Sequence, residues 1–252
     1  FIFLFLFLVS FLLQMYNSFL PGYFIVFFCL IYSGWIYIVD KKRLELLLKK
    51  ETLVGIIITV LLILPIVIPY LNVAEDFGAK RDIRDSIHFA LQPEDYFYPG
   101  EHTRLEGVLK TLSIQMNYPK EASLKPGFLG LLFSILVVVA STSYFRSRKR
   151  LKNVATPFIF TALVGLILSL GPFLHFGRAT IHHPFPIPLP YALLYYIAPG
   201  FQGFRNSARW EMLFVICMSV VICLYLTQAL KKIKGLKLFA VYAICFLLII
   251  WE

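Results

Sequence analysis

The stretch WEMLFVICMSVVICLYLTQAL, residues 210–230, decides the fold class. It contains a single charged residue, Glu211, at its beginning. About twenty apolar residues is the length that an α-helix needs to cross roughly 30 Å of hydrocarbon. The stretch therefore predicts a transmembrane helix.

Further apolar runs indicate that this span belongs to a polytopic protein. Hydrophobic residues make up 59% of the 252 residues and charged residues only 15%, a composition that leaves too little polar surface for a water-soluble domain. The chain is predicted to be an all-α transmembrane helical bundle of about seven spans. These are expected at 1–16, 23–39, 53–71, 127–145, 154–175, 210–230 and 238–251.

Positive charge gives the bundle its expected orientation. More than half of the 24 Lys and Arg residues fall in three short loops, at 40–51, 146–152 and 231–237. Pairs of predicted spans separate these loops, so all three lie on one side, which the positive-inside rule identifies as the cytoplasm. We expect a multi-pass protein of the cell membrane. The net charge of +10 is explained by topology, and nucleic acid is not an expected partner.

The same alternation places two longer regions, 72–126 and 176–209, on the outer face. The first contains an amphipathic segment around residues 83–91, and the second a proline-rich run, HHPFPIPLP, that cannot be helical. YALLYYIA, which follows, is too short to span and predicts an interfacial or re-entrant helix. Pro21 and Gly22 are expected to break the chain in a turn at 17–22.

The domain organisation is expected to be simple. Residues 1–252 form one transmembrane domain, and because Phe1 lies within an apolar run without a preceding Met, we expect the chain to be a fragment of a longer protein.

Two arginines precede the span at 210–230. Arg205 and Arg209 are four residues apart, which in a helix puts both on one face, and Asn206 or Ser207 could cap that helix. Two guanidinium groups beside a helix N-terminus suit a phosphate. Alternatively, both arginines anchor the span to lipid headgroups or pair with carboxylates such as Glu211.

Other candidates for chemistry are weaker. Glu94 and Asp95 could act as general bases or hold a divalent cation, or could be ordinary loop charges. The adjacent His182 and His183 lack a partner at metal-ligand spacing, so no metal site is predicted. The sequence contains neither a phosphate-binding loop nor a nucleophile motif.

Two stretches resemble a known family. IPLPYALLYYIAPGFQGFRNSARWEML (187–213) and HFALQPEDYFYPGEHTRLEG (88–107) are similar to conserved segments of large prokaryotic polytopic membrane proteins related to glycosyltransferases of the GT-C fold. The likeness covers roughly residues 70–250. Ser207 departs from the pattern, since many of those proteins have proline near this position.

The resemblance implies an enzyme that transfers a sugar from a polyprenyl-phosphate donor to an acceptor on the outer face. Arg205 and Arg209 would then bind the donor phosphate, and membrane lipids and the lipid-linked sugar would be its partners. The acidic residue that serves such enzymes as base or metal ligand would lie upstream of Phe1. The alternative is a non-catalytic membrane protein, flippase-like or a scaffold, in envelope polysaccharide assembly.

Overall fold

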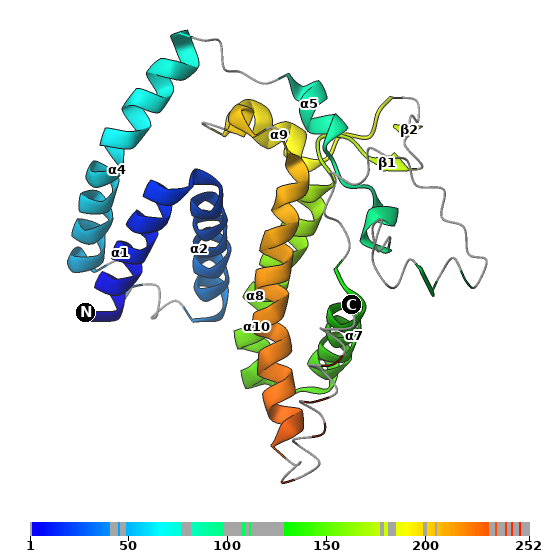
Figure 1. Ribbon diagram of the computed structural model, residues 1–252. Coiled ribbons are helices and arrows are strands. Elements are labelled where there is room, and N and C mark those ends of the chain that lie inside the picture. Colours follow the sequence, from blue (N-terminus) through cyan, green and yellow to red (C-terminus); the bar gives the residue numbers. More distant parts are fainter. Residues whose placement is uncertain are drawn as a thin grey trace. The chain divides into compact units, whose positions relative to one another are not determined.

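The structure is a computed structural model in which the chain forms two compact units, Phe1–Lys80 and Arg81–Glu252 (Figure 1). The residues that it describes are 2–40, 45, 49–76, 82–97, 107–108, 111, 129–176, 179–180, 185–198, 201–204, 206–231, 235, 240, 243 and 247.

The first unit contains three apolar helices, α1 (Ile2–Asn17), α2 (Phe19–Val39) and α4 (Lys50–Asp76). Helix α1 contacts both of the others. The predicted turn at 17–22 is wrong in extent, because α2 begins at Phe19 and includes Pro21 and Gly22. Proline is tolerated in the first turn of a helix, where its missing N–H has no intrahelical acceptor.

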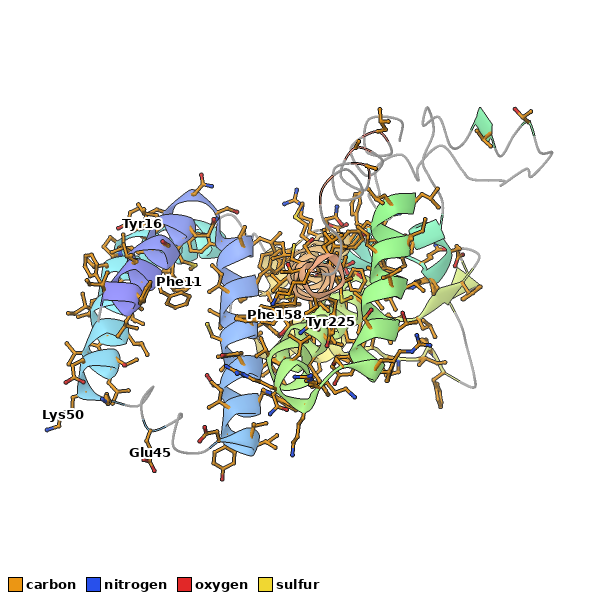
Figure 2. All side chains as sticks on the ribbon, turned by 90° about the horizontal axis from the view of Figure 1, so that it is seen from below. Phe11, Tyr16, Glu45, Lys50, Phe158 and Tyr225 are labelled. Carbon is orange, nitrogen blue, oxygen red and sulfur yellow. The ribbon has the colours of Figure 1, made fainter. Side chains whose placement is uncertain are left out.

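Helix α4 continues through two prolines. Pro65 has no N–H, so the helical hydrogen bond to the carbonyl of Leu61 is lost. The Tyr16 hydroxyl of α1 donates a hydrogen bond of 2.9 Å to the neighbouring carbonyl, that of Leu62. Tyr16 and Phe11 both extend from α1 in Figure 2. The neighbouring helix thus supplies a donor near the proline, as expected for proline within an apolar helix.

The second unit is built on three helices, α7 (Leu131–Arg146), α8 (Lys149–Ser169) and α10 (Glu211–Leu230). Helix α10 packs along α8 and also contacts α7. At one end of α10, Tyr225 hydrogen-bonds Ser147 at 3.1 Å and its ring packs edge-on against Tyr144. Figure 2, which looks along α10, shows Tyr225 where the three helices meet.

Gly165 allows α8 and α10 to come into backbone contact. A Cβ atom at this position would lie 2.9 Å from both the Trp210 carbonyl oxygen and the Phe214 nitrogen. Small residues permit this kind of approach between helices in membranes, where dispersion forces and packing drive association. Gly165 therefore determines how closely the beginning of α10 lies on α8.

Shorter elements gather at the end of α8 and the start of α10. They are α5 (Ile83–His88), the 3₁₀ turn η1 (Pro93–Phe97), strands β1 (His175–Phe176) and β2 (Ala179–Thr180), α9 (Pro190–Ile197), and the 3₁₀ turns η3 (Phe201–Gly203) and η4 (Ser207–Trp210). The antiparallel pair of β1 and β2 is a small exception to the predicted all-α class.

The fifth predicted span, 154–175, has the wrong bounds. Helix α8 begins earlier, at Lys149, and ends at Ser169. Gly171 follows with φ +75°, a conformation that suits glycine and commonly ends helices. A Cβ at Gly171 would also lie 2.5 Å from that of Ala90, so the chain after α8 passes directly against the segment that follows α5.

Residues 186–189 of the proline-rich run are extended, as predicted, whereas its last residue, Pro190, begins α9. The N–H of Leu189 donates to Pro172 O at 2.9 Å, and the N–H of Leu174 donates to Ile187 O at 3.1 Å. Pro186 and Pro188 have no N–H to donate. Ile187, between them, accepts one of these bonds, and Leu189, after them, donates the other. Residues 187–189 thereby pair with 172–174.

Four helices are long and apolar enough to cross a membrane: Phe19–Val39, Lys50–Pro69, Lys149–Ser169 and Ser207–Leu230. Helices α1 and α7 are apolar but have only 16 residues each. Most of the seventh predicted span, 238–251, lies outside the described residues, as does most of 98–128. These findings support a helical membrane protein.

Gly165→Ala is expected to destabilise the second unit, because the new methyl group would overlap the backbone of α10. Overpacking of this kind costs about 1–3 kcal/mol. The matched control is Gly34→Ala in α2, where nothing lies within 4 Å of the added Cβ. Thermal unfolding in detergent should show a lower midpoint for Gly165→Ala only, and an equal midpoint for both variants would contradict the contact.

Candidate functional site

The segment before α10 is held by an aromatic cluster. Trp210 and Phe201 are fully buried, and their rings stack with centroids 5.5 Å apart. Phe204 packs edge-on against both rings. Asn206 is extended, and its side chain accepts a hydrogen bond of 2.9 Å from the N–H of Ala208, so it is the cap of η4. One of the two predicted caps is thus confirmed.

Arg209 lies at the surface of this segment. Its neighbours Ala208 and Trp210 are buried, whereas Arg209 is exposed. Within the described part of the chain, Arg209 forms no ion pair, so the predicted alternative of pairing with Glu211 is not found there. The guanidinium group of Arg209 is therefore open to an external anion.

Arg205 lies outside the described residues. Asn206, which follows it, is extended, with φ −111° and ψ 100°. That the two arginines lie on one face of a helix stays a prediction. A shared role in phosphate binding stays a prediction.

Buried hydroxyl groups connect this segment to α5 and α9. Ser207 donates a hydrogen bond of 3.0 Å to the backbone oxygen of Ser86, and the Ser86 hydroxyl lies 3.3 Å from that of Tyr191. Both hydroxyls also reach the Phe204 carbonyl oxygen. Burial, partly offset by the Ser86 hydrogen bond, raises the pKa of Tyr191 to about 12, so its hydroxyl remains a donor.

This network gives Ser207 a structural role. Proline at this position has no hydroxyl and could not donate to Ser86. The bond joins residues 121 positions apart in the chain, and both side chains are completely buried. Ser207 therefore helps to fix the backbone that presents Arg209.

Asp95 has a clear structural role. Its carboxylate accepts a hydrogen bond of 2.8 Å from the N–H of Gln92, and its own N–H donates to the Gln92 carbonyl at 2.9 Å. The first bond is one half of a capping box at the start of η1, and the second is the ordinary backbone bond of a 3₁₀ turn. Asp95 is only 5% exposed, while its neighbour Glu94 is half-buried. The weak prediction that either residue is catalytic stays a prediction.

Glu211 is a second buried carboxylate, only 7% exposed, in the first turn of α10. Among the described residues it has neither a hydrogen bond nor an ion pair to its carboxylate. The helix dipole favours an acidic residue at this position, because a negative charge in the first turn stabilises a helix by about 0.3–1 kcal/mol.

Tyr96 lies within electrostatic range of both carboxylates. Its hydroxyl hydrogen-bonds the Ser169 hydroxyl and reaches the Leu166 carbonyl at 3.5 Å, which attaches η1 to the end of α8. Burial raises the pKa of Tyr96 well above its usual value, the Ser169 hydrogen bond lowers it, and the nearby charges of Glu211 and Asp95 raise it further. A neutral phenol thus lies close to two acidic side chains.

Sequence reasoning missed Glu211 as a site residue. It considered Glu211 only as a counter-ion for the arginines, although an acidic residue inside an apolar span is itself a signal of function. Its proximity to Asp95 and Tyr96 could not be found from the sequence, because η1 and α10 are more than a hundred residues apart.

The histidines give no indication of a metal centre. His175 is buried, with its Nδ1 atom 2.6 Å from the Phe173 carbonyl, whereas His182 and His183 lie outside the described residues. No group of three or more His, Cys, Asp or Glu side chains in the described part of the chain could hold a metal ion. The alternative in which Glu94 and Asp95 hold a divalent cation stays a hypothesis.

Comparison with known proteins finds no match to a protein family, to a curated protein or to a solved structure.

Two variants of Asp95 distinguish the hydrogen bond that its side chain accepts from the effect of its negative charge. Asp95→Ala removes the acceptor for the Gln92 N–H and should cost about 0.5–2 kcal/mol of stability, as for other lost caps. Asp95→Asn keeps an acceptor oxygen and should unfold close to the wild-type temperature in detergent. If Asp95→Asn is as unstable as Asp95→Ala, the charge matters and the capping account is wrong.

Proposed function

We propose that this protein is a membrane glycosyltransferase that transfers a sugar from a polyprenyl-phosphate donor to an acceptor on the outer face. The observation that carries the proposal is the exposed Arg209 at the start of a membrane helix, two residues before the buried carboxylate of Glu211. The resemblance of residues 88–107 and 187–213 to GT-C-related proteins supplies the reaction class.

The chemistry of the donor suits this position. A polyprenyl phosphate keeps its chain in hydrocarbon and its phosphate at the interface, where the first residues of a spanning helix emerge. Arginine binds phosphate through paired N–H donors and neutralises the negative charge that develops on a departing phosphate. Arg205 is proposed to share this role with Arg209.

Glu211 is proposed to assist the acceptor. In glycosyl transfer the acceptor oxygen bonds to the anomeric carbon, the bond from that carbon to the phosphate oxygen breaks, and the acceptor hydroxyl loses its proton. A carboxylate within hydrogen-bond reach can take this proton. Glu211 suits this role better than Asp95, whose carboxylate already accepts the Gln92 N–H.

The proposed topology extends the four helices that are long enough to span. Helices α1 and α7 are apolar, but 16 residues measure about 24 Å, less than the roughly 30 Å of a bilayer core. We propose that both cross the membrane with help from adjoining residues or local thinning of the bilayer. Together with 238–251 they give about seven spans, with 72–126 and 176–209 outside and the basic loops in the cytoplasm.

Replacing Arg209 tests the phosphate site. Arg209→Ala in the full-length protein should weaken binding of the polyprenyl-phosphate sugar about 10- to 100-fold, the value of a hydrogen-bonded charged partner. Transfer of a radiolabelled sugar in membranes should fall accordingly. The matched control is Arg84→Ala, because Arg84 is also an exposed arginine of this unit but lies 4.0 Å from Asp82. Equal transfer by both variants would mean that Arg209 is only an interfacial anchor.

Glu211→Gln distinguishes a catalytic from a structural role. A lost general base should lower kcat by at least about 100-fold and leave donor binding unchanged. A helix-dipole role predicts unchanged transfer and a stability loss of about 1 kcal/mol or less. Single-turnover transfer and thermal unfolding, measured on the same preparation, decide between these outcomes.

The flippase-like or scaffold alternative makes a separate prediction. Purified full-length protein would then transfer no sugar from any polyprenyl-phosphate donor, although its deletion would still impair the envelope polymer. That pair of results would reject the enzyme assignment.

A further inference from the structure

Helix α9 has two faces of different character. Tyr191 and Tyr195, one turn apart, are buried at 0% and 8% exposure. On the other side, Leu193, Tyr196 and Ile197 are 62%, 69% and 69% exposed. The spacing of these three residues, i, i+3 and i+4, places them on one stripe of the helix.

This exposed stripe is apolar along the whole helix, since the sequence PYALLYYI contains no charged residue. The exposed Phe185 and Ile187 on the preceding extended segment add to the same kind of surface. A group of large exposed apolar side chains on a short helix marks a binding surface for lipid or protein.

The neighbouring helices indicate which of these partners covers α9. Helix α8 exposes Phe160, Leu163 and Ile167, and α10 exposes Met212 and Ile216. The spacings are helical, and both helices belong to the set that is long enough to span. Their exposed stripes are the surfaces that face lipid. Helix α9 contacts α8, so lipid that lies against α8 is also close to α9.

The orientation of α9 suits the boundary between water and hydrocarbon. Figure 1 shows α9 lying across the end of α8 and α10 instead of along them. The candidate span Ser207–Leu230 has 24 residues, which is about 36 Å. It is longer than a hydrocarbon core of about 30 Å, so at least one end of the span extends beyond the core. Tyrosine is enriched at this depth, because its ring is apolar and its hydroxyl is polar.

We infer that α9 is a membrane-surface helix whose Leu193, Tyr196 and Ile197 insert into the acyl-chain boundary of the bilayer, with phospholipid as the occupant. Tyr191 and Tyr195 hold the opposite face to the protein, Tyr191 through the buried hydroxyl network with Ser86. Of the two alternatives left by the sequence, the inference favours an interfacial over a re-entrant helix. The inference does not rest on the proposed function.

Depth-dependent quenching tests the inference. Single cysteines replace Leu193 or Tyr196 in a full chain whose four natural cysteines are alanine, and each carries the fluorophore NBD. The protein is placed in phosphatidylcholine vesicles containing lipid that is spin-labelled near the headgroup. The control label replaces Arg84, whose side chain is 88% exposed.

Labels at Leu193 and Tyr196 should emit at shorter wavelength and lose most of their fluorescence to the spin-labelled lipid, while the label at Arg84 should not. Quenching at both positions no stronger than at Arg84 would overturn the inference. So would shielding from the spin-labelled lipid together with energy transfer between labels on different molecules, which would show a second copy of the chain on this face. Two positions are used so that local disturbance by one label is recognised.

Discussion

The contact of α10 with Gly165 of α8 is the constraint on which the second unit depends. It allows the backbone of Trp210 and Phe214 to lie directly on α8, without an intervening side chain. Trp210 then packs into the aromatic cluster with Phe201 and Phe204, which fixes the turn that carries Arg209. Glu211, which follows Trp210 in the chain, is brought to the end of α8, where Tyr96 is hydrogen-bonded to Ser169.

Charge is distributed unevenly around this contact. The cation, Arg209, is exposed, whereas the carboxylates of Asp95 and Glu211 are buried and are not neutralised by Arg209. An exposed guanidinium at the end of an apolar helix is available to an anion held at the membrane surface. Buried carboxylates are costly to maintain, which is why such groups in membrane proteins commonly serve function.

Four of the predicted apolar spans correspond to helices long and apolar enough to cross a membrane, because twenty consecutive apolar residues have few other uses. The sequence predicted their ends poorly. Helix α8 stops at Ser169 because Gly171 adopts a positive φ against Ala90, a tertiary contact that the local pattern does not contain. Helix α2 includes Pro21 and Gly22, since both fit its first turn.

The candidate site was predictable only in part. The position of Arg209 before a span and the cap by Asn206 followed from residue types and spacing. The capping role of Asp95 did not. The approach of Glu211 to Asp95 and Tyr96 needed the fold, because it joins segments that are distant in the sequence.

The most direct test of the central claim is photo-crosslinking of full-length protein in nanodiscs by a diazirine-bearing polyprenyl phosphate, with the labelled peptide identified by mass spectrometry. The account predicts labelling of residues 201–213 that excess polyprenyl phosphate abolishes and polyprenol does not. Labelling spread over the apolar helices, or competed equally by polyprenol, would contradict a phosphate site at the start of α10.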